Sequence, residues 1–288
     1  MNGIGYGNSM FLATHGILAR SGGGGGASLL LDTYTNAAVA YSLRKLRTAY
    51  SGSAIRVRRS SDNTEQDIGF VGNDLDTTSL LSFVGANNGF ITTWYDQSTN
   101  ANNATQSTVA SQAQIVSSGS LILDADTSKI TTTWTTDFYS LTNGISTNTK
   151  YLSISMFRRG SITSHTLSHL GNSSSAIPNT LYWLGTGSAY SVRSYMPTLF
   201  VFQNVSTQGR CIMTSLKDAS NLKVAYRNGV QLTNTATEAP AVGTLNVFGA
   251  AGTTYTSGQY QEYIYWDSEQ SANRTAIEDN INTYWNAY

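Results

Sequence analysis

A cluster of polar side chains follows an apolar, aromatic run in the first third of the sequence. The run from Ile91 to Tyr95 ends at Asp96, and small hydroxyl and amide side chains follow: Gln97, Ser98, Asn100, Asn102 and Asn103. A carboxylate backed by such groups suits a catalytic acid with its helpers, a metal-binding loop or a rigid turn. These three interpretations lead to an enzyme, a metal-dependent binder and a building block.

A rigid turn explains the cluster most simply. The side-chain oxygens of Asp96 and Ser98 accept hydrogen bonds from nearby backbone N–H groups in Asx and Ser/Thr turns. Asn100, Asn102 and Asn103 tolerate the left-handed backbone conformations that such a loop needs. The alternative is calcium at Asp96, which is weaker because the loop has one carboxylate and no distal Glu. We therefore expect a structural turn and no required cofactor.

An aromatic segment in the middle of the chain is a second candidate site. Residues 179–196 place four aromatic side chains among glycines: Tyr182, Trp183, Tyr190 and Tyr195. Aromatic faces offer contact area to a sugar at low entropic cost, so these residues are a predicted carbohydrate-contact patch. The alternative is burial, because alternate aromatic residues in a β-sandwich usually fill the space between its sheets.

Other reactive side chains have simpler interpretations. His165 and His169 are four residues apart, but their Ser/Thr-rich surroundings favour a loop or strand over a helical metal site. Cys211 is the single cysteine, so no intrachain disulfide can form, and its apolar neighbours predict a buried thiol. The glycine run 22–26 lacks the Lys-Ser/Thr ending of a phosphate loop.

The charge balance argues against nucleic acid as a partner. The 288 residues include 17 basic and 17 acidic side chains, whereas phosphate contacts require a basic surplus. Two local clusters, "RKLR" (44–47) and "RVRR" (56–59), are expected to pair with nearby acids. The sequence has neither a charged segment leading into an apolar core at its start nor a run of about 18 apolar residues, so we expect no signal peptide and no membrane span.

The two ends of the chain have distinct patterns. Residues 1–28 are Gly-rich with one apolar patch, which predicts a flexible docking arm that orders only against a partner. A helix is predicted over residues 35–52, with an apolar stripe of Val39, Leu43, Leu46 and Tyr50. A second helix is predicted over 271–288, with Ser271 as its N-cap and a buried stripe of Ile277, Ile281, Tyr284 and Trp285.

Between these helices, short segments rich in β-branched and aromatic residues alternate with turn residues. The Asn228-Gly229 pair predicts a two-residue type I′ hairpin turn. Many short strands, few prolines and only terminal helices predict an all-β fold, a concanavalin A-like antiparallel β-sandwich or jelly roll over residues 29–288.

Two passages resemble known families. "LRTAYSGSAIRVRRSSDNTEQDIGF" and "ITTWYDQSTNANNATQ" resemble the catalytic domain of α-L-arabinofuranosidase B, and "LKVAYRNGVQLT" with "GQYQEYIYWDSEQSANRTAIEDNINTYW" resembles laminin-G-like jelly rolls. The two matches cover most of residues 40–107 and 222–285. Together with the Gly-rich arm, the expected lack of a signal peptide and the absence of a disulfide, the chain resembles virion proteins of tailed phages.

The resemblance to the glycosidase includes motifs of the structural framework and does not include the segment that would carry the catalytic residues. Glycosidases need two carboxylates across the scissile bond. The resembled family carries its nucleophilic Glu in a strand in the middle of the domain, whereas residues 150–225 contain no Glu and one acid, Asp218. We expect Glu262 to be structural, Glu238 to be solvated, and Glu65 and Asp67 to lie in a turn. No catalytic residue is assigned.

Three functions follow from these observations. The first is a non-enzymatic structural component of a bacteriophage virion, a fibre, spike or capsid decoration that binds other virion proteins through its arm and forms a homo-oligomer, with a trimer as the expected form. The second is a carbohydrate-binding module for host-surface glycans. The third is a glycoside hydrolase related to α-L-arabinofuranosidase. The arm and the missing Glu favour the first.

Overall fold

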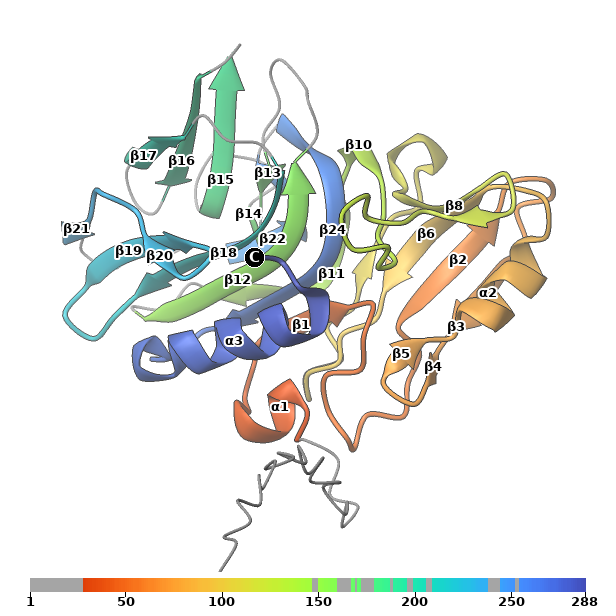
Figure 1. Cartoon of the computed structure of the whole chain (residues 1–288), viewed down its shortest axis with the longest axis horizontal. Coiled ribbons are helices and arrows are strands. Elements are labelled where there is room, and N and C mark those ends of the chain that lie inside the picture. Colours follow the sequence, from red (N-terminus) through yellow and green to blue (C-terminus); the bar gives the residue numbers. More distant parts are fainter. Residues whose placement is uncertain are drawn as a thin grey trace, which may run out of the picture.

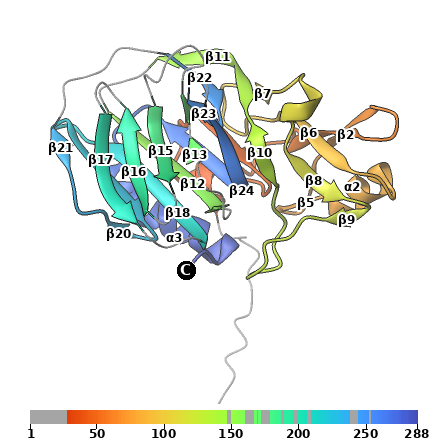
Figure 2. The same ribbon diagram turned by 90° about the horizontal axis from the view of Figure 1, so that it is seen from above.

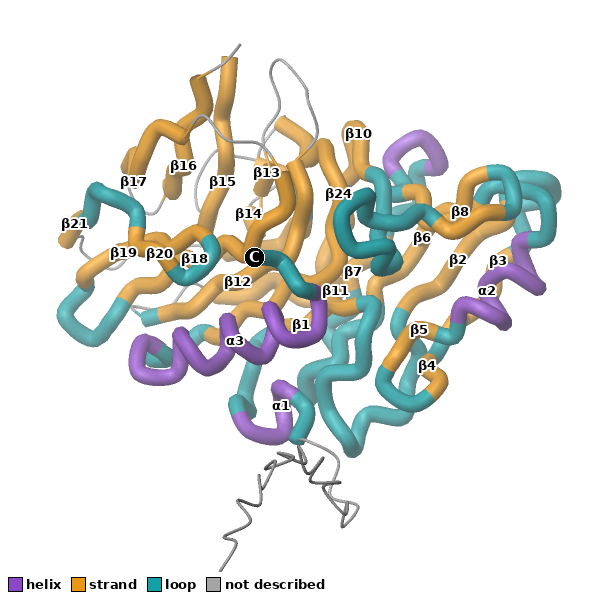
Figure 3. The backbone as a smooth tube through the Cα atoms, in the orientation of Figure 1, coloured by secondary structure: helices purple, strands orange, loops and turns teal. Residues whose placement is uncertain are grey.

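The computed structural model consists mainly of β-strands, with three α-helices among the residues it describes (Figures 1 and 3). It describes residues 28–146, 150–159, 167–168, 170–171, 179–186, 189–195, 199–205, 209–237, 244–251 and 254–288. The strand pairs along both large sheets are antiparallel. The predicted all-β sandwich is therefore confirmed.

The first sheet is built around the long strand β24. Along the sheet the strands follow in the order β1 (Val39–Ser42), β24 (Thr254–Trp266), β12 (Tyr151–Arg159), β18 (Gly209–Lys217), β19 (Leu222–Arg227) and β20 (Val230–Gln231). Three short strands pair at its margins: β10 (Trp134–Asp137), β21 (Ala236–Thr237) and β23 (Ala250–Ala251). This sheet joins the start of the domain to its end.

The second sheet contains most of the N-terminal strands. Its order is β14 (Leu170–Gly171), β22 (Thr244–Phe248), β11 (Tyr139–Ser146), β7 (Ala104–Thr105), β6 (Gly89–Trp94), β2 (Ile55–Arg59) and β3 (Glu65–Ile68), with β8 (Gln114–Ser117) and β9 (Ser120–Leu121) paired beside β6. A four-stranded sheet contains β13 (Leu167–Ser168), β15 (Asn179–Thr186), β16 (Ala189–Tyr195) and β17 (Leu199–Val205). A small hairpin joins β4 (Phe70–Val71) to β5 (Asp74–Leu75). Figure 2 shows the four-stranded sheet and the strands β2, β6 and β8 at opposite sides of the molecule.

Aromatic side chains fill the space between the two large sheets. Phe248 of the second sheet lies with its ring centroid 5.4 Å from that of Tyr41 and 5.2 Å from that of Tyr263, both in the first sheet. Trp134 packs edge-on against Phe248 at 5.2 Å. Each such ring buries a large apolar area, so this cluster supplies much of the hydrophobic stabilisation.

The helix predicted over residues 35–52 is wrong. A four-residue helix, α1 (Leu30–Thr33), precedes this segment, and Val39–Ser42 instead form β1, paired with β24 from Val39 opposite Tyr265 to Ser42 opposite Glu262. All four residues of β1 are buried, so the strand shows no alternation of polar and apolar side chains. Pairing with a long central strand overrides the local helical pattern.

The predicted C-terminal helix is confirmed. A 3₁₀ turn, η2 (Ser271–Asn273), leads into α3 (Arg274–Trp285). The N-cap position of the α-helix is Asn273, which makes no side-chain capping hydrogen bond, and the prediction of Ser271 as the N-cap is wrong because Ser271 begins the 3₁₀ turn. Ile277, Ile281 and Trp285 are fully buried, whereas Tyr284 is partly exposed. The helix packs along the first sheet (Figure 1).

Two shorter helical elements were not predicted. The helix α2 (Thr77–Val84) is capped by Asp76, whose side chain accepts a hydrogen bond from the backbone N–H of Ser79. A second 3₁₀ turn, η1 (Val109–Ser111), precedes β8. Within the described part of the chain, no helix has both the length and the apolar character needed to cross a bilayer.

Candidate functional site

The loop after β6 is closed by a single buried carboxylate. Oδ1 of Asp96 accepts hydrogen bonds from the backbone N–H groups of Ala40 (2.8 Å) and Ser98 (2.9 Å). Oδ2 accepts from Oγ of Ser98 (2.7 Å) and from the N–H of Asn102 (2.9 Å). Burial raises the pKa of Asp96, and the four hydrogen bonds oppose that rise.

This arrangement makes Asp96 a structural group. A carboxylate has about four lone-pair positions, and here protein donors take four of them, which leaves none for a calcium ion. Among the described residues, no group of three or more His, Cys, Asp or Glu side chains is placed to hold a metal. The loop therefore has neither a free acid nor a cation site.

The amide side chains of the loop also bond to the protein. Nδ2 of Asn100 donates to the carbonyls of Ala37 and Ala38, and Oδ1 of Asn103 accepts from the backbone N–H of Asp96. The left-handed residue of the loop is Ala101, with φ of 51°, and none of its asparagines adopts this conformation. The expected role of the asparagines in tolerating positive φ is therefore wrong, since they act through their side chains.

Gln97 does more in this loop than its sequence context indicates. Its buried side chain donates from Nε2 to the carbonyls of Ser42 (3.0 Å) and Arg44 (2.9 Å). Its Oε1 accepts from the N–H of Leu46 at 2.8 Å. Gln97 therefore satisfies three backbone groups at the end of β1 and in the irregular segment that follows it.

The Asn228-Gly229 pair forms the turn between β19 and β20. Both residues have positive φ, 52° and 76°, as a type I′ turn requires. Oδ1 of Asn228 accepts a hydrogen bond from the backbone N–H of Ile212 on β18 at 2.9 Å. The turn is thus fixed to a neighbouring strand as well as closing its own hairpin.

The four aromatic residues of the predicted contact patch lie on neighbouring strands of the four-stranded sheet. Tyr182 and Trp183 belong to β15, and Tyr190 and Tyr195 belong to β16, which pairs with it. Their side chains lie outside the described part of the structure, as do His165, His169 and Glu238. The pairing brings the four backbone positions together on one small sheet.

The other acids and the single thiol have structural environments. Glu262 is buried and binds Arg44 through both oxygens, with Nε–Oε2 of 2.7 Å, and it also accepts from the indole N–H of Trp285. Cys211 is fully buried in β18, and burial raises the pKa of its thiol to about 11. The thiol is therefore unreactive.

The two basic clusters divide into paired and unpaired arginines. Three arginines form ion pairs: Arg44 with Glu262, Arg56 with Asp67 and Arg59 with Asp62. Arg47 and Arg58 have no carboxylate at ion-pair distance in the described part of the chain. Each of these two side chains lines a cavity.

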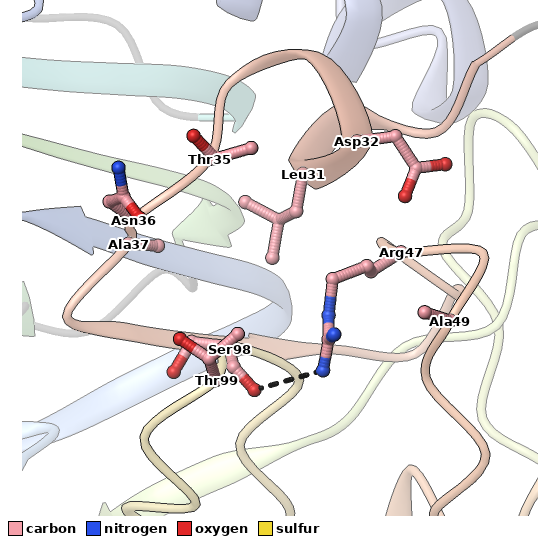
Figure 4. Close-up of a pocket in the computed structure, with 9 residues that line it drawn as sticks. All are labelled: Leu31, Asp32, Thr35, Asn36, Ala37, Arg47, Ala49, Ser98 and Thr99. Carbon is pink, nitrogen blue, oxygen red and sulfur yellow. Dashed lines mark hydrogen bonds between the residues drawn. The ribbon is translucent and has the colours of Figure 1, made fainter.

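The first cavity, of about 450 Å³, lies between α1 and the Asp96 loop (Figure 4). Arg47 donates from Nε to the carbonyl of Gln97 and from Nη2 to that of Ser98, each at 3.3 Å. On the opposite wall, Asp32 accepts from both the backbone N–H and the hydroxyl of Thr48. Both charged groups are engaged by the protein, which gives this cavity a mainly structural character.

The second cavity, the polar cleft, has a volume of about 500 Å³ and is lined mostly by hydroxyl, amide and charged side chains. Its charged groups are Arg58 and Asp137, and Phe90 adds an aromatic ring. Burial raises the pKa of Asp137 to about 6. Sequence reasoning missed both charged residues, and nothing in the count of charges signals the site, since the three arginines of "RVRR" are followed by three acids, Asp62, Glu65 and Asp67.

Four cavities lined by described residues each contain one acid: Asp32, Asp137, Glu65 and Asp74. A glycosidase site needs two carboxyl groups about 5–10 Å apart. These four cavities therefore provide binding groups, and none of them contains a pair of acids.

The comparisons with known proteins agree with this scaffold. Residues 31–151 match the family model of the α-L-arabinofuranosidase B catalytic domain. Two solved structures that resemble the chain are a GH54 α-L-arabinofuranosidase soaked with a cyclic sulfate inhibitor (TM-score 0.64) and an arabinofuranosidase complexed with arabinofuranosyl-α-1,2-xylobiose (TM-score 0.60). Each is 15% identical, with 88% of this chain and 64% of that chain covered.

The resemblance seen in the N-terminal sequence motifs is therefore confirmed as a similarity to this catalytic domain and its fold. At 15% identity the solved structures establish the fold alone, and the chain spans less than two thirds of their length. No curated protein matches the sequence.

Proposed function

We propose that this protein recognises carbohydrate through a β-sandwich of the arabinofuranosidase B type. The observation that carries the proposal is the match of residues 31–151 to that catalytic domain, supported by a shared fold over 88% of the chain. The polar cleft and the aromatic strands β15 and β16 supply the kinds of side chains that contact sugars.

Binding is favoured over hydrolysis because few acidic residues are placed where a glycosidase needs its two carboxylates. Residues 150–225 contain no Glu, and the polar cleft and three further cavities each contain a single carboxylate. Hydrolysis of an α-L-arabinofuranoside is the second candidate, since the matched family model is a catalytic one. The raised pKa of Asp137, about 6, also suits a general acid, although a partner carboxylate would still be needed.

Direct binding to arabinose-containing oligosaccharides tests the proposal. Titration of arabinoxylan oligosaccharides into the full chain should give saturable heat, and Trp183→Ala should reduce affinity at least tenfold if β15 contributes. Tyr288→Ala, which removes an exposed aromatic ring at the C-terminus, serves as a control and should leave affinity unchanged. A chain that binds no glycan contradicts the proposal.

The hydrolytic alternative has a separate readout. Incubation with 4-nitrophenyl α-L-arabinofuranoside should release no nitrophenol beyond the uncatalysed rate if the protein only binds. Turnover that is abolished by Asp137→Asn would replace the binding proposal with hydrolysis. Turnover unaffected by this substitution would also establish hydrolysis, with its acid outside the cleft.

We further propose that the carbohydrate-binding domain is displayed on a bacteriophage virion, docked through the Gly-rich arm of residues 1–28 and assembled as a closed homo-oligomer. The support is the composition of the arm, which cannot bury a core of its own. Deleting residues 1–28 should abolish incorporation into particles while the isolated domain keeps its melting temperature. Incorporation at the wild-type level would contradict this placement.

A further inference from the structure

The polar cleft is lined by residues of β2, β6, β8 and β10 and of the loops beside them. Its volume of about 500 Å³ falls within the usual range of small-ligand sites, about 300–1,000 Å³. Figure 2 shows β2, β6 and β8 on the side of the molecule away from β15 and β16. The cleft is therefore separate from the aromatic strands that the sequence singled out.

Arg58 is a buried cation held only by neutral groups. Its side chain is 5% exposed, and it donates from Nε to Oε1 of Gln112 and from Nη1 to Oδ1 of Asn63, both at 2.8 Å. The guanidinium centre lies 5.0 Å from the ring centroid of Phe90. Gln112 is fixed in turn, because its Nε2 donates to the carbonyl of Gln106. The guanidinium is positioned by these groups, and among the described residues no carboxylate lies at ion-pair distance from it. The nearby acids are Glu65, opposite Arg58 across the β2–β3 pair, and Asp137 in the same cleft.

The neighbouring arginines show that this is a local exception. Arg56 and Arg59 lie on the same strand, β2, and each forms an ion pair with an aspartate, Asp67 and Asp62 respectively. A buried charge without a partner is costly, so an anionic ligand at Arg58 would regain that free energy. Nη2 of Arg58 receives no acceptor from the described part of the protein and remains for such a ligand.

Asp137 supplies an acceptor to the same cleft. It is 2% exposed, and its Oδ2 accepts one hydrogen bond, from the backbone N–H of Thr135 at 2.6 Å. Among the described residues no donor reaches its Oδ1. An acceptor of this kind bonds to hydroxyl groups, and the amide of Asn88 and the hydroxyl of Thr133 add further polar partners.

We propose that the polar cleft binds an acidic sugar unit, with the sugar carboxylate on the guanidinium of Arg58 and ring hydroxyls on Asp137 and the surrounding amides. A planar guanidinium matches a carboxylate through paired hydrogen bonds. A phosphate dianion fits less well, because the cleft has one cation and the carboxyl of Asp137 would repel the second charge. This proposal rests on carbohydrate recognition as the proposed function and names the class of sugar at one site.

The test compares trigalacturonate with its methyl ester, which is neutral and otherwise the same oligosaccharide. Calorimetric titration of the full-length chain should show at least tenfold weaker binding of the ester, because it lacks the carboxylate. This comparison uses the unmodified protein, so it does not depend on whether a variant folds. Equal affinities for acid and ester overturn the proposal.

Two variants of the same strand locate the interaction. Arg58→Gln should weaken trigalacturonate at least tenfold, whereas Arg56→Gln, whose parent arginine is paired with Asp67 and does not line the cleft, should leave it unchanged. Equal effects of the two substitutions, or no effect of either, overturn the assignment to Arg58. Thermal melting of each variant verifies that it is folded.

Failure of this inference and failure of the proposed function are distinguishable. Binding of neutral arabinoxylan oligosaccharides without any preference for the acidic trisaccharide overturns the cleft proposal and leaves carbohydrate recognition standing. Binding of neither class overturns both. Binding of trigalacturonate that depends on Arg58 supports both.

Discussion

Asp96 and Asp137 are both buried to 2% exposure, yet their surroundings differ. Asp96 receives three hydrogen bonds from its own loop and one from Ala40 of β1, whereas Asp137 receives one, from Thr135. A carboxylate with all its acceptor positions filled holds the backbone in place. A carboxylate that lines a cleft and keeps an acceptor position open can bind a ligand.

The arginines divide in the same way. Arg44 and Arg58 are each 5% exposed, but Arg44 is neutralised by Glu262 through two hydrogen bonds and Arg58 is held by neutral amides. The fold thus pairs the buried charges beside β1 and leaves two buried charged groups, Arg58 of β2 and Asp137 of β10, without an ion pair among the described residues. This difference separates the structural region from the candidate binding region.

The largest effect is expected from Asp96→Asn. The new amide NH₂ would face protein donors where an acceptor is required, so the free energy of unfolding should fall by about 3–5 kcal/mol. Urea denaturation measures this change. Asp62→Asn, at an exposed ion pair, is the control and should cost much less than Asp96→Asn, because solvent screens the charges. A small loss at Asp96 would remove the contrast between the two aspartates.

Asp137→Asn should stabilise the folded protein, in contrast to Asp96→Asn. The folded-state pKa of about 6 lies above the usual 3.8, so the unfolded chain loses its proton first and the stability of the wild type falls as pH rises from about 4 to 6. The substitution removes this cost and should raise the free energy of unfolding by about 2 kcal/mol at pH 7. Melting curves at pH 7 and pH 4 should differ between variant and wild type only at pH 7. Destabilisation at pH 7 would show that Asp137 is as structural as Asp96.

Ser98→Ala, in the Asp96 loop, should lower the free energy of unfolding by a moderate amount. The hydroxyl donates to Oδ2 of Asp96 at 2.7 Å and accepts from the N–H of Asn100 at 3.1 Å. Losing both bonds should cost about 1–2 kcal/mol, because the buried carboxylate keeps three donors. Urea denaturation gives the value, and a loss equal to that of Asp96→Asn would be inconsistent with shared hydrogen bonding.

Asn63→Gly should have the smallest effect. Glycine preserves the positive φ of 59° at this position while removing the acceptor for Nη1 of Arg58, which water in the cleft can replace. The expected loss is below about 1 kcal/mol. Differential scanning calorimetry detects this change, and a loss above 2 kcal/mol would mean that the cleft is as tightly integrated as the Asp96 loop.

Local patterns in the sequence predicted part of this structure. The turn at Asn228-Gly229 and the stripe of Ile277 and Ile281 depend on neighbouring residues, so the sequence contains their signal. The strand at Val39–Ser42 depends on its pairing with β24, more than 200 residues away. All four of its residues are buried, so the sequence lacks the polar–apolar alternation of a strand and its apolar residues also fit the spacing of a helix. The nonlocal pairing with β24 therefore determines the structure of this segment, and the local pattern predicts it wrongly.

The polar cleft was missed for a related reason. The pairing of β2 with β6 shifts register between Arg56 and Val57, so simple alternation does not give the faces of the arginines that follow. Asp137 enters the cleft from β10, which is far from Arg58 in sequence and belongs to the other large sheet. Neither the register shift in β2 nor the approach of β10 to β2 can be recognised from a local pattern in the sequence.

The pairing of β1 with β24 also has a consequence for synthesis of the protein. Ser42 donates a hydrogen bond to Glu262, a partner 220 residues later in the chain. During translation, β1 and the buried side chain of Arg44 therefore wait for their partners until β24 has been made. The first sheet can close only after residue 266 has left the ribosome, so its closure depends on contacts between residues far apart in the sequence, which form slowly.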